Sequence, residues 1–198
     1  MNILHSSVSK KCLEDSFVNT PVTIHVRMNA RIFRRFAMYD TFFLKRRWLA
    51  PALFAVIFIA FAAAAFVLTS NSQASMIGNL LLIIGLGLPL AYVLHFLLQI
   101  HDQCKRLGLK HLRPAYTLNM HEKELRIIND INPEPEVTLS WHSLHGVWRS
   151  EFAFYIYANP SRAFIVPDGQ YALTPAQMYD FLYQRLPAGK MHGKRPKT

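Results

Sequence analysis

A run of 53 residues without one Asp, Glu, Lys or Arg, from Trp48 to Ile100, constrains this chain more than any other feature. A helix needs roughly 20 apolar residues to cross the hydrocarbon core of a bilayer. The run is long enough for two crossings, and a polar, uncharged stretch at 69–75 marks a turn between them. The sequence therefore predicts a transmembrane hairpin over residues 48–100, with crossings at 49–68 and 76–98.

Basic side chains flank this run on both sides. Residues 1–47 carry nine basic and three acidic side chains, and residues 101–113 carry four and one, whereas the turn at 69–75 carries none. Positively charged flanks stay on the cytoplasmic side of a membrane. We therefore expect a multi-pass protein of the bacterial cytoplasmic (inner) membrane with both termini in the cytoplasm.

The segments outside the hairpin predict four further parts. Residues 1–47 are expected to be a cytoplasmic leader, with a candidate strand at 22–26 and a basic amphipathic helix at 29–47 that begins at the N-cap Asn29. Residues 114–186 contain six short strands at intervals of about ten residues, which is typical of a small antiparallel barrel or sandwich. Whether 22–26 joins that sheet is left open. Residues 187–198 are predicted to be a basic, disordered tail.

The end of the folded segment carries a clear helix start. Thr174, Pro175 and Gln177 combine an N-cap, proline at the first helical position and a capping-box glutamine. The apolar residues that follow are spaced on one side of the predicted helix. We expect this helix to cover an open end of the sheet.

The charge distribution argues against a nucleic-acid-binding protein, and the cysteine positions argue against a disulfide-bonded one. Residues 114–186 carry five basic and eight acidic side chains, whereas nucleic-acid-binding domains concentrate Lys and Arg on their folded surface. No nucleic-acid partner is therefore expected. Cys12 and Cys104 both fall on the predicted cytoplasmic side, where thiols stay reduced, so no disulfide is expected.

Small residues in the two crossings predict close helix packing. They allow two helix backbones to approach each other in lipid, and they offer a route to a homo-oligomer. Pro89 is expected to kink the second crossing. The small residues are Ala60, Ala62, Ala63, Ala64 and Ala65 in the first crossing and Gly78, Gly85 and Gly87 in the second.

Several stretches of the chain resemble the YcxB-like family of bacterial membrane proteins. These stretches are Tyr116–Leu118, Leu139–Trp141 with Val147, Phe154–Tyr157, Ala163–Pro167 and the closing helix. The resemblance covers about residues 22–186. It implies two transmembrane helices and a cytoplasmic domain related to the pleckstrin-homology (PH) fold, with no established catalytic activity. Asp168 stands where the family often has a basic residue, so an anion contact there gains no support.

Histidine and cysteine side chains are the first candidates for chemistry. His95 lies inside a crossing, where a polar side chain is a functional hypothesis, but it is about five residues from the helix end and is interpreted first as interfacial. His142 and His145 are three residues apart, and His101 and Cys104 repeat that spacing. Zinc sites need three or four ligands, so no metal site is expected.

Aromatic and basic residues of the folded segment are the second candidates. Trp141 and Trp148 could hold a ligand, but strand alternation places them first in the core or at the rim. His121 and Lys123 could meet a lipid headgroup, but the net charge of −3 on residues 114–186 would repel an anionic surface. Phosphate loops and nucleophile elbows are missing from the sequence.

These observations lead to one expectation of fold and function. We expect an α+β membrane protein: a two-helix transmembrane hairpin with a small antiparallel PH-like β-barrel or sandwich capped by a C-terminal helix. The bilayer would be one partner and an unknown protein, bound at the cytoplasmic domain, the other. The expected function is a non-enzymatic, membrane-tethered interaction or regulatory module without cofactor, metal or catalytic residues. The alternatives are a small oligomeric transporter or channel subunit and an enzyme whose site needs a partner.

Overall fold

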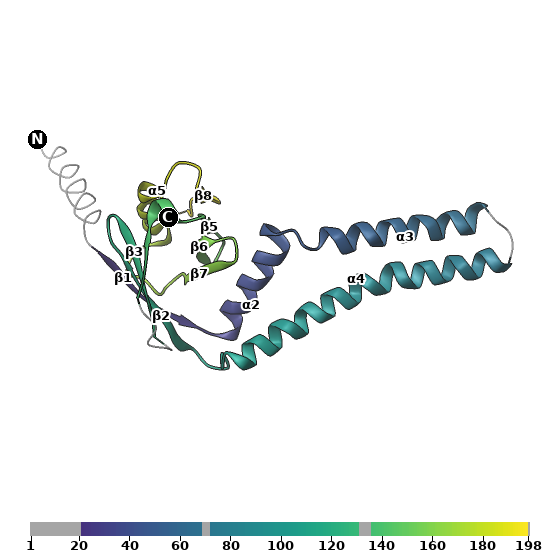
Figure 1. The fold of residues 1–198 in the computed structure, drawn as a ribbon, viewed down its shortest axis with the longest axis horizontal. Helices are drawn as coiled ribbons and strands as arrows, with labels where there is room; N and C mark the ends of the chain where they lie inside the picture. The colour runs from purple at the N-terminus through teal and green to yellow at the C-terminus, as the bar shows by residue number, and fades with distance from the viewer. Residues whose placement is uncertain (1–20, 69–71, 131–135, 198) are drawn as a thin grey trace, which may run out of the picture. The chain divides into compact units, whose positions relative to one another are not determined.

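The computed structural model describes residues 21–68, 72–130 and 136–197 (Figure 1). The chain divides into two compact units. The first, which we call the sheet domain, contains the described residues up to Met28 and from Leu112 onward. The second, the hairpin unit, contains Asn29–His111. Each unit is described separately below.

The sheet domain contains two four-stranded sheets. The first is antiparallel throughout, and the second is antiparallel except for its last strand, which pairs in parallel with β5. The first sheet has the order β1 (Val22–Met28), β2 (Arg113–Met120), β3 (Glu124–Asn129), β4 (Val137–Ser140). The second has the order β7 (Arg162–Pro167), β6 (Ala153–Asn159), β5 (Gly146–Arg149), β8 (Met191–His192).

Strand β1 belongs to the first sheet, which answers the question that the sequence left open. It pairs with β2 along its length, with Ile24 opposite Leu118 and Met28 opposite Arg113. Its buried residues alternate with exposed ones, as a strand with one face on a core requires. The hairpin unit is therefore inserted between two strands that pair directly with each other.

One hydrophobic core joins both sheets to helix α5 (Pro175–Arg185). The predicted capping box is confirmed, because the Gln177 backbone N–H donates to Thr174 Oγ1 and the Thr174 backbone N–H donates to Gln177 Oε1. Met178, Phe181 and Leu182 are buried at helical spacing on the face of α5 that meets the core. This packing positions α5 as the element that closes the core.

The two sheets do not form a closed barrel, so the barrel alternative of the predicted barrel or sandwich is wrong, and the domain contains two separate, mainly antiparallel sheets. Side chains bind backbone groups of the outer strands β1 and β7: that of Tyr116, on β2, and that of Gln170, which follows β7. The Tyr116 hydroxyl donates to the Ile165 carbonyl over 2.8 Å and accepts from the Ile165 N–H over 2.6 Å. The Gln170 amide likewise accepts from the Arg27 N–H and donates to the Arg27 carbonyl. Because these side chains satisfy the edge groups at Arg27 and Ile165, the strands do not pair there.

A Tyr116→Phe substitution is expected to lower the free energy of unfolding by about 2 kcal/mol, since it leaves the Ile165 N–H and carbonyl without this partner. Burial raises the pKa of the Tyr116 hydroxyl above its ordinary value near 10. Below pH 10 the phenol is neutral in both states, and above it the unfolded chain ionises first, so stability is lost as the pH rises. Denaturant titrations across this range should show a smaller alkaline loss for the variant; an unchanged loss would contradict this assignment.

The C-terminal segment 187–197 is structured, in contrast to the disordered tail that the sequence predicted. Strand β8 pairs with β5, and the Arg195 guanidinium donates to both carboxylate oxygens of Asp180 on α5. Gly193 has φ 99°, and a Cβ there would lie 2.7 Å from the Arg149 carbonyl oxygen. The tail lies against the second sheet because glycine allows this approach.

The hairpin unit contains two helices long and apolar enough to cross a membrane, α3 (Leu49–Leu68) and α4 (Ser72–Arg106). Before them come α2 (Ala30–Met38) and a π-helical turn, η1 (Tyr39–Leu44). The predicted helix at 29–47 thus begins after Asn29, whose side chain accepts from the Ile32 N–H, and changes its hydrogen-bonding pattern at Tyr39. Helix α4 continues through Pro89 and is longer than the predicted crossing.

Helices α3 and α4 pack through three of the predicted small residues. Ala62 is fully buried, a Cβ on Gly85 would lie 2.9 Å from Phe58 Cβ, and a Cβ on Gly78 would lie 2.8 Å from the Phe66 ring. Gly87 has open space around it, and Ala60 and Ala63 are exposed. The close approach is therefore confirmed for one face of each helix.

Helix α4 ends in a Schellman motif at Gly108. Gly108 has φ 63°, its N–H donates to the Lys105 carbonyl, and the Leu109 N–H donates to the Cys104 carbonyl. The Leu109 carbonyl then accepts from the Ala30 N–H over 2.9 Å. This bond joins the first residue of α2 to the segment after α4.

Candidate functional site

A half-buried polar cluster of the sheet domain contains an ion pair between Arg149, at the end of β5, and Asp168, just after β7. Two parallel hydrogen bonds of 2.7 Å join Arg149 Nη1 and Nη2 to Asp168 Oδ1 and Oδ2. The Arg149 side chain is only 7% exposed and that of Asp168 is 25% exposed. The guanidinium also lies 4.5 Å from the centre of the Phe154 ring. This geometry is the bidentate pairing that arginine makes with carboxylates.

Tyr171 completes this cluster. Its hydroxyl donates to Asp168 Oδ1 over 2.6 Å. Burial, and then the hydrogen bond to Asp168, raise the pKa of the Tyr171 hydroxyl, so the group stays protonated and holds the carboxylate. Asp168 neutralises Arg149, and the cluster therefore offers no open cation to an anionic ligand.

An aromatic stack lies where the tail meets β5. The Trp148 ring stacks with His145 at 5.7 Å and with His192 at 4.6 Å between ring centres, and it meets Tyr157 edge-on at 4.8 Å. A Cβ on Gly146 would lie 2.9 Å from the Trp148 ring. Trp148 therefore lies flat on the sheet at its rim, held by contacts within the domain.

Trp141 occupies a different place from Trp148. It begins a short 3-10 helix, η2 (Trp141–Ser143), and is 2% exposed. Its indole N–H donates to the His121 carbonyl over 3.0 Å. The expected core position is thus confirmed for Trp141, and Trp148 takes the rim position.

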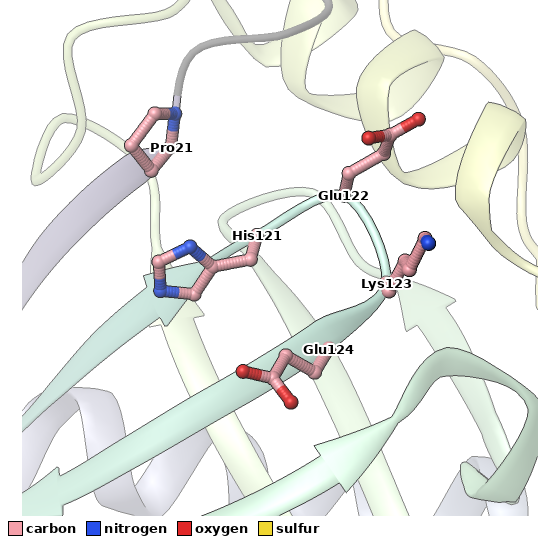
Figure 2. Close-up of a pocket in the computed structure, with 5 residues that line it drawn as sticks. All are labelled: Pro21, His121, Glu122, Lys123 and Glu124. Carbon is pink, nitrogen blue, oxygen red and sulfur yellow. The ribbon is translucent and has the colours of Figure 1, made fainter.

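The turn between β2 and β3 lines a pocket (Figure 2). It is formed by Pro21 and the four consecutive residues His121, Glu122, Lys123 and Glu124. Glu124 also accepts a hydrogen bond from Arg126. Two carboxylates beside one lysine do not favour an anionic ligand, which agrees with the charge argument made from the sequence.

The histidine and cysteine candidates are not brought together into a metal site. His145 stacks on Trp148, whereas the His142 carbonyl accepts from Lys190 Nζ. On α4, His101 is exposed and Cys104 is buried. Among residues 21–68, 72–130 and 136–197, three or more His, Cys, Asp or Glu side chains do not gather in a metal-binding geometry.

His95 is exposed on α4, one residue before Phe96. The Phe96 ring meets Phe42 of η1 edge-on, with 5.4 Å between ring centres. His95 is therefore near the end of the hairpin where η1 lies, as the interfacial interpretation expects.

Sequence reasoning did not find Arg149, Tyr171, Tyr116 or Gln170. Arg149 and Asp168 are 19 residues apart, and Gln170 binds the backbone of a residue 143 positions earlier. Such pairs have no local spacing pattern. The opposite charges of Arg149 and Asp168 at two strand ends were the only signal in the sequence.

These features define an α+β chain that combines a two-sheet domain with two helices able to span a membrane. Searches against protein-family models, curated proteins and solved structures found no match to this chain.

Proposed function

We propose that the chain is an integral protein of the bacterial inner membrane, in which the hairpin anchors a cytoplasmic domain that binds a protein partner. One observation carries the anchor: α3 and the apolar part of α4 are free of charged residues, and almost none of their surface is buried within the protein. Soluble proteins rarely expose continuous apolar surface of this extent, whereas a bilayer accommodates it.

The cytoplasmic orientation is supported by the charges of the hairpin unit. Lys45, Arg46 and Arg47 precede α3, and Lys105 and Arg106 end α4, so both groups lie at the same end of the hairpin. A side with this excess of basic residues is retained in the cytoplasm. Strand β1 leads into α2 and strand β2 follows α4, so the sheet domain is connected in sequence to this end of the hairpin.

The sheet domain is proposed to bind a partner and not to catalyse a reaction, because several of its polar side chains already bind one another or the backbone. Arg149, Asp168 and Tyr171 bind one another, and Tyr116 and Gln170 bind backbone groups. These side chains are used in holding the domain together. Among the residues that the structure describes, strand β4, by contrast, is the last strand of its sheet and pairs with β3 on one side. An extended segment of a partner can add to such an edge through backbone hydrogen bonds.

The relation to YcxB-like proteins and to the PH fold remains part of this proposal. It is supported by the order of the elements: four strands of one sheet, three of the next, then a helix over the core. The insertion of the hairpin unit after the first strand is compatible with that order.

Site-specific photo-crosslinking in native membranes tests the function. A photoreactive residue at Thr138, exposed on β4, is expected to capture one defined protein, and the same residue at Ser161, exposed between β6 and β7, is expected not to. Capture of only the chain itself would favour the transporter alternative. Reporter fusions at each terminus test the orientation, and an external C-terminus would overturn the proposal.

A further inference from the structure

Helix α2 has an apolar and a basic face. It lies against α4 within the hairpin unit, at the open end of the hairpin (Figure 1). The half-buried residues include Ile32, Phe33 and Phe36, and the exposed ones include Arg31, Arg34 and Arg35. The arginines are spaced three and four residues apart, so they share one face of the helix.

Contacts at both ends hold α2 and η1 in place. The Ala30 N–H donates to the Leu109 carbonyl after the end of α4. Twelve residues further along the chain, Phe42 packs against Phe96 of α4, and the Phe42 carbonyl accepts from the Trp48 indole N–H over 3.1 Å. The basic face is therefore presented by a fixed element.

The charges around α2 are strongly one-sided. Residues 29–111 contain nine Lys and Arg but only two acidic residues, Asp40 and Asp102. Asp40 pairs with Lys45 over 2.7 Å. Because α2 itself contains no acidic residue, its own sequence offers no partner to Arg31 or Arg34.

The lengths of the helices indicate the depth of α2. With a rise of 1.5 Å per residue, α3 is about 30 Å long and α4 about 52 Å. The hydrocarbon core is about 30 Å thick. If α3 spans the core, about 22 Å of α4 extends beyond it, which is enough to pass through the headgroup layer, about 5–8 Å thick on each side, where lipid phosphates lie. Helix α2 lies beside this extension, with η1 nearer the core at Phe96 and Ala30 nearer the end of α4.

We propose that the arginine face of α2 binds the phosphate groups of anionic phospholipids in the leaflet next to Trp48. Guanidinium groups bind phosphate oxygens through paired hydrogen bonds, and basic residues close to a membrane attract anionic lipids. This inference rests on the proposed membrane insertion. It differs from headgroup binding by the sheet domain, whose charge disfavours it.

The test uses the full chain in vesicles of phosphatidylcholine and phosphatidylglycerol. Two vesicle preparations are compared, in which one lipid or the other carries brominated acyl chains that quench nearby tryptophan. The fluorescence of Trp141 and Trp148 is measured in a Trp48→Phe variant and subtracted, which leaves the signal of Trp48. We expect brominated phosphatidylglycerol to quench Trp48 more than its share of the mixture predicts. The R31Q/R34Q variant should lose this preference, by about fivefold for each arginine removed.

A matched control removes the same charge elsewhere. The K123Q/K194Q variant changes two exposed lysines of the sheet domain and should keep the preference. An equal loss in both variants, or no preference in the unaltered chain, would overturn the inference. If inorganic phosphate reduced the preference for phosphatidylglycerol more than chloride of equal ionic strength did, the arginines would bind a soluble anion. That result would also overturn the inference. A chain that brominated phosphatidylcholine does not quench is not inserted, and that result contradicts the proposed function.

Discussion

An Asp168→Ala substitution is expected to lower the free energy of unfolding of the sheet domain by about 3 kcal/mol. It leaves the Arg149 guanidinium, whose side chain is 7% exposed, without its bidentate partner, and it removes the acceptor of the Tyr171 hydroxyl. A buried charge without a partner is costly because the surrounding protein replaces its hydration poorly. Because Asp168 is itself one-quarter exposed, we expect a value at the lower end of the range for buried pairs. Chemical denaturation followed by tryptophan fluorescence measures the change.

Two variants separate the charge effect from general damage. Asp180→Ala breaks the ion pair with Arg195, in which both side chains are about half exposed, and should cost much less than Asp168→Ala because solvent screens this pair. Replacing Arg149 by Met and Asp168 by Leu together should recover much of the loss, since a buried ion pair is often replaceable by apolar side chains. If Asp168→Ala cost no more than Asp180→Ala, Arg149 would not depend on this carboxylate.

A Gly85→Ala substitution is expected to weaken the packing of α3 against α4 by about 1–3 kcal/mol. The added Cβ would lie 2.9 Å from Phe58 Cβ and 3.6 Å from the Ala55 carbonyl oxygen. Neither atom lies at the end of a flexible side chain, so the helices must separate. The loss should exceed the gain of up to about 1 kcal/mol that alanine brings to a helix. Unfolding of the chain by SDS from mild detergent micelles measures the effect.

Two other glycines of α4 provide a graded comparison. At Gly78 the added Cβ meets the tip of the Phe66 ring, which can rotate away, so Gly78→Ala should cost less than Gly85→Ala. Gly87 has nothing within 4 Å, and Gly87→Ala should leave the hairpin as stable or slightly more stable. A larger loss at Gly87 than at Gly85 would mean that the other face of α4 carries the packing.

Patterns of local spacing predicted most of the elements. The short strand-like segments at intervals of about ten residues in 114–186 indicated six strands that the structure contains, and the Thr174–Gln177 motif indicated the start of α5. Their success has a common reason, because strand alternation and helix caps depend on neighbours within a few residues.

Predictions that depended on distant residues were incomplete or wrong. The barrel or sandwich was predicted from strand spacing alone, which does not show whether β1 and β7 pair with each other. Tyr116 and Gln170 bind backbone groups of these strands at Ile165 and Arg27. The tail was predicted to be disordered from its basic composition, but Gly193 and Arg195 attach it to Arg149 and Asp180. In each case the partner is far away in the sequence or is recognised through backbone geometry.

The sequence by itself determined the uncharged run, its basic flanks, the strand periods and the helix caps, because composition and short spacings encode all of these. Only the tertiary structure decided that Val22–Met28 pairs with β2 across the whole hairpin unit, that Asp168 neutralises Arg149, and which glycines face α3. These features arise when segments remote in the chain meet, and their energies depend on burial and distance, which a linear pattern does not contain.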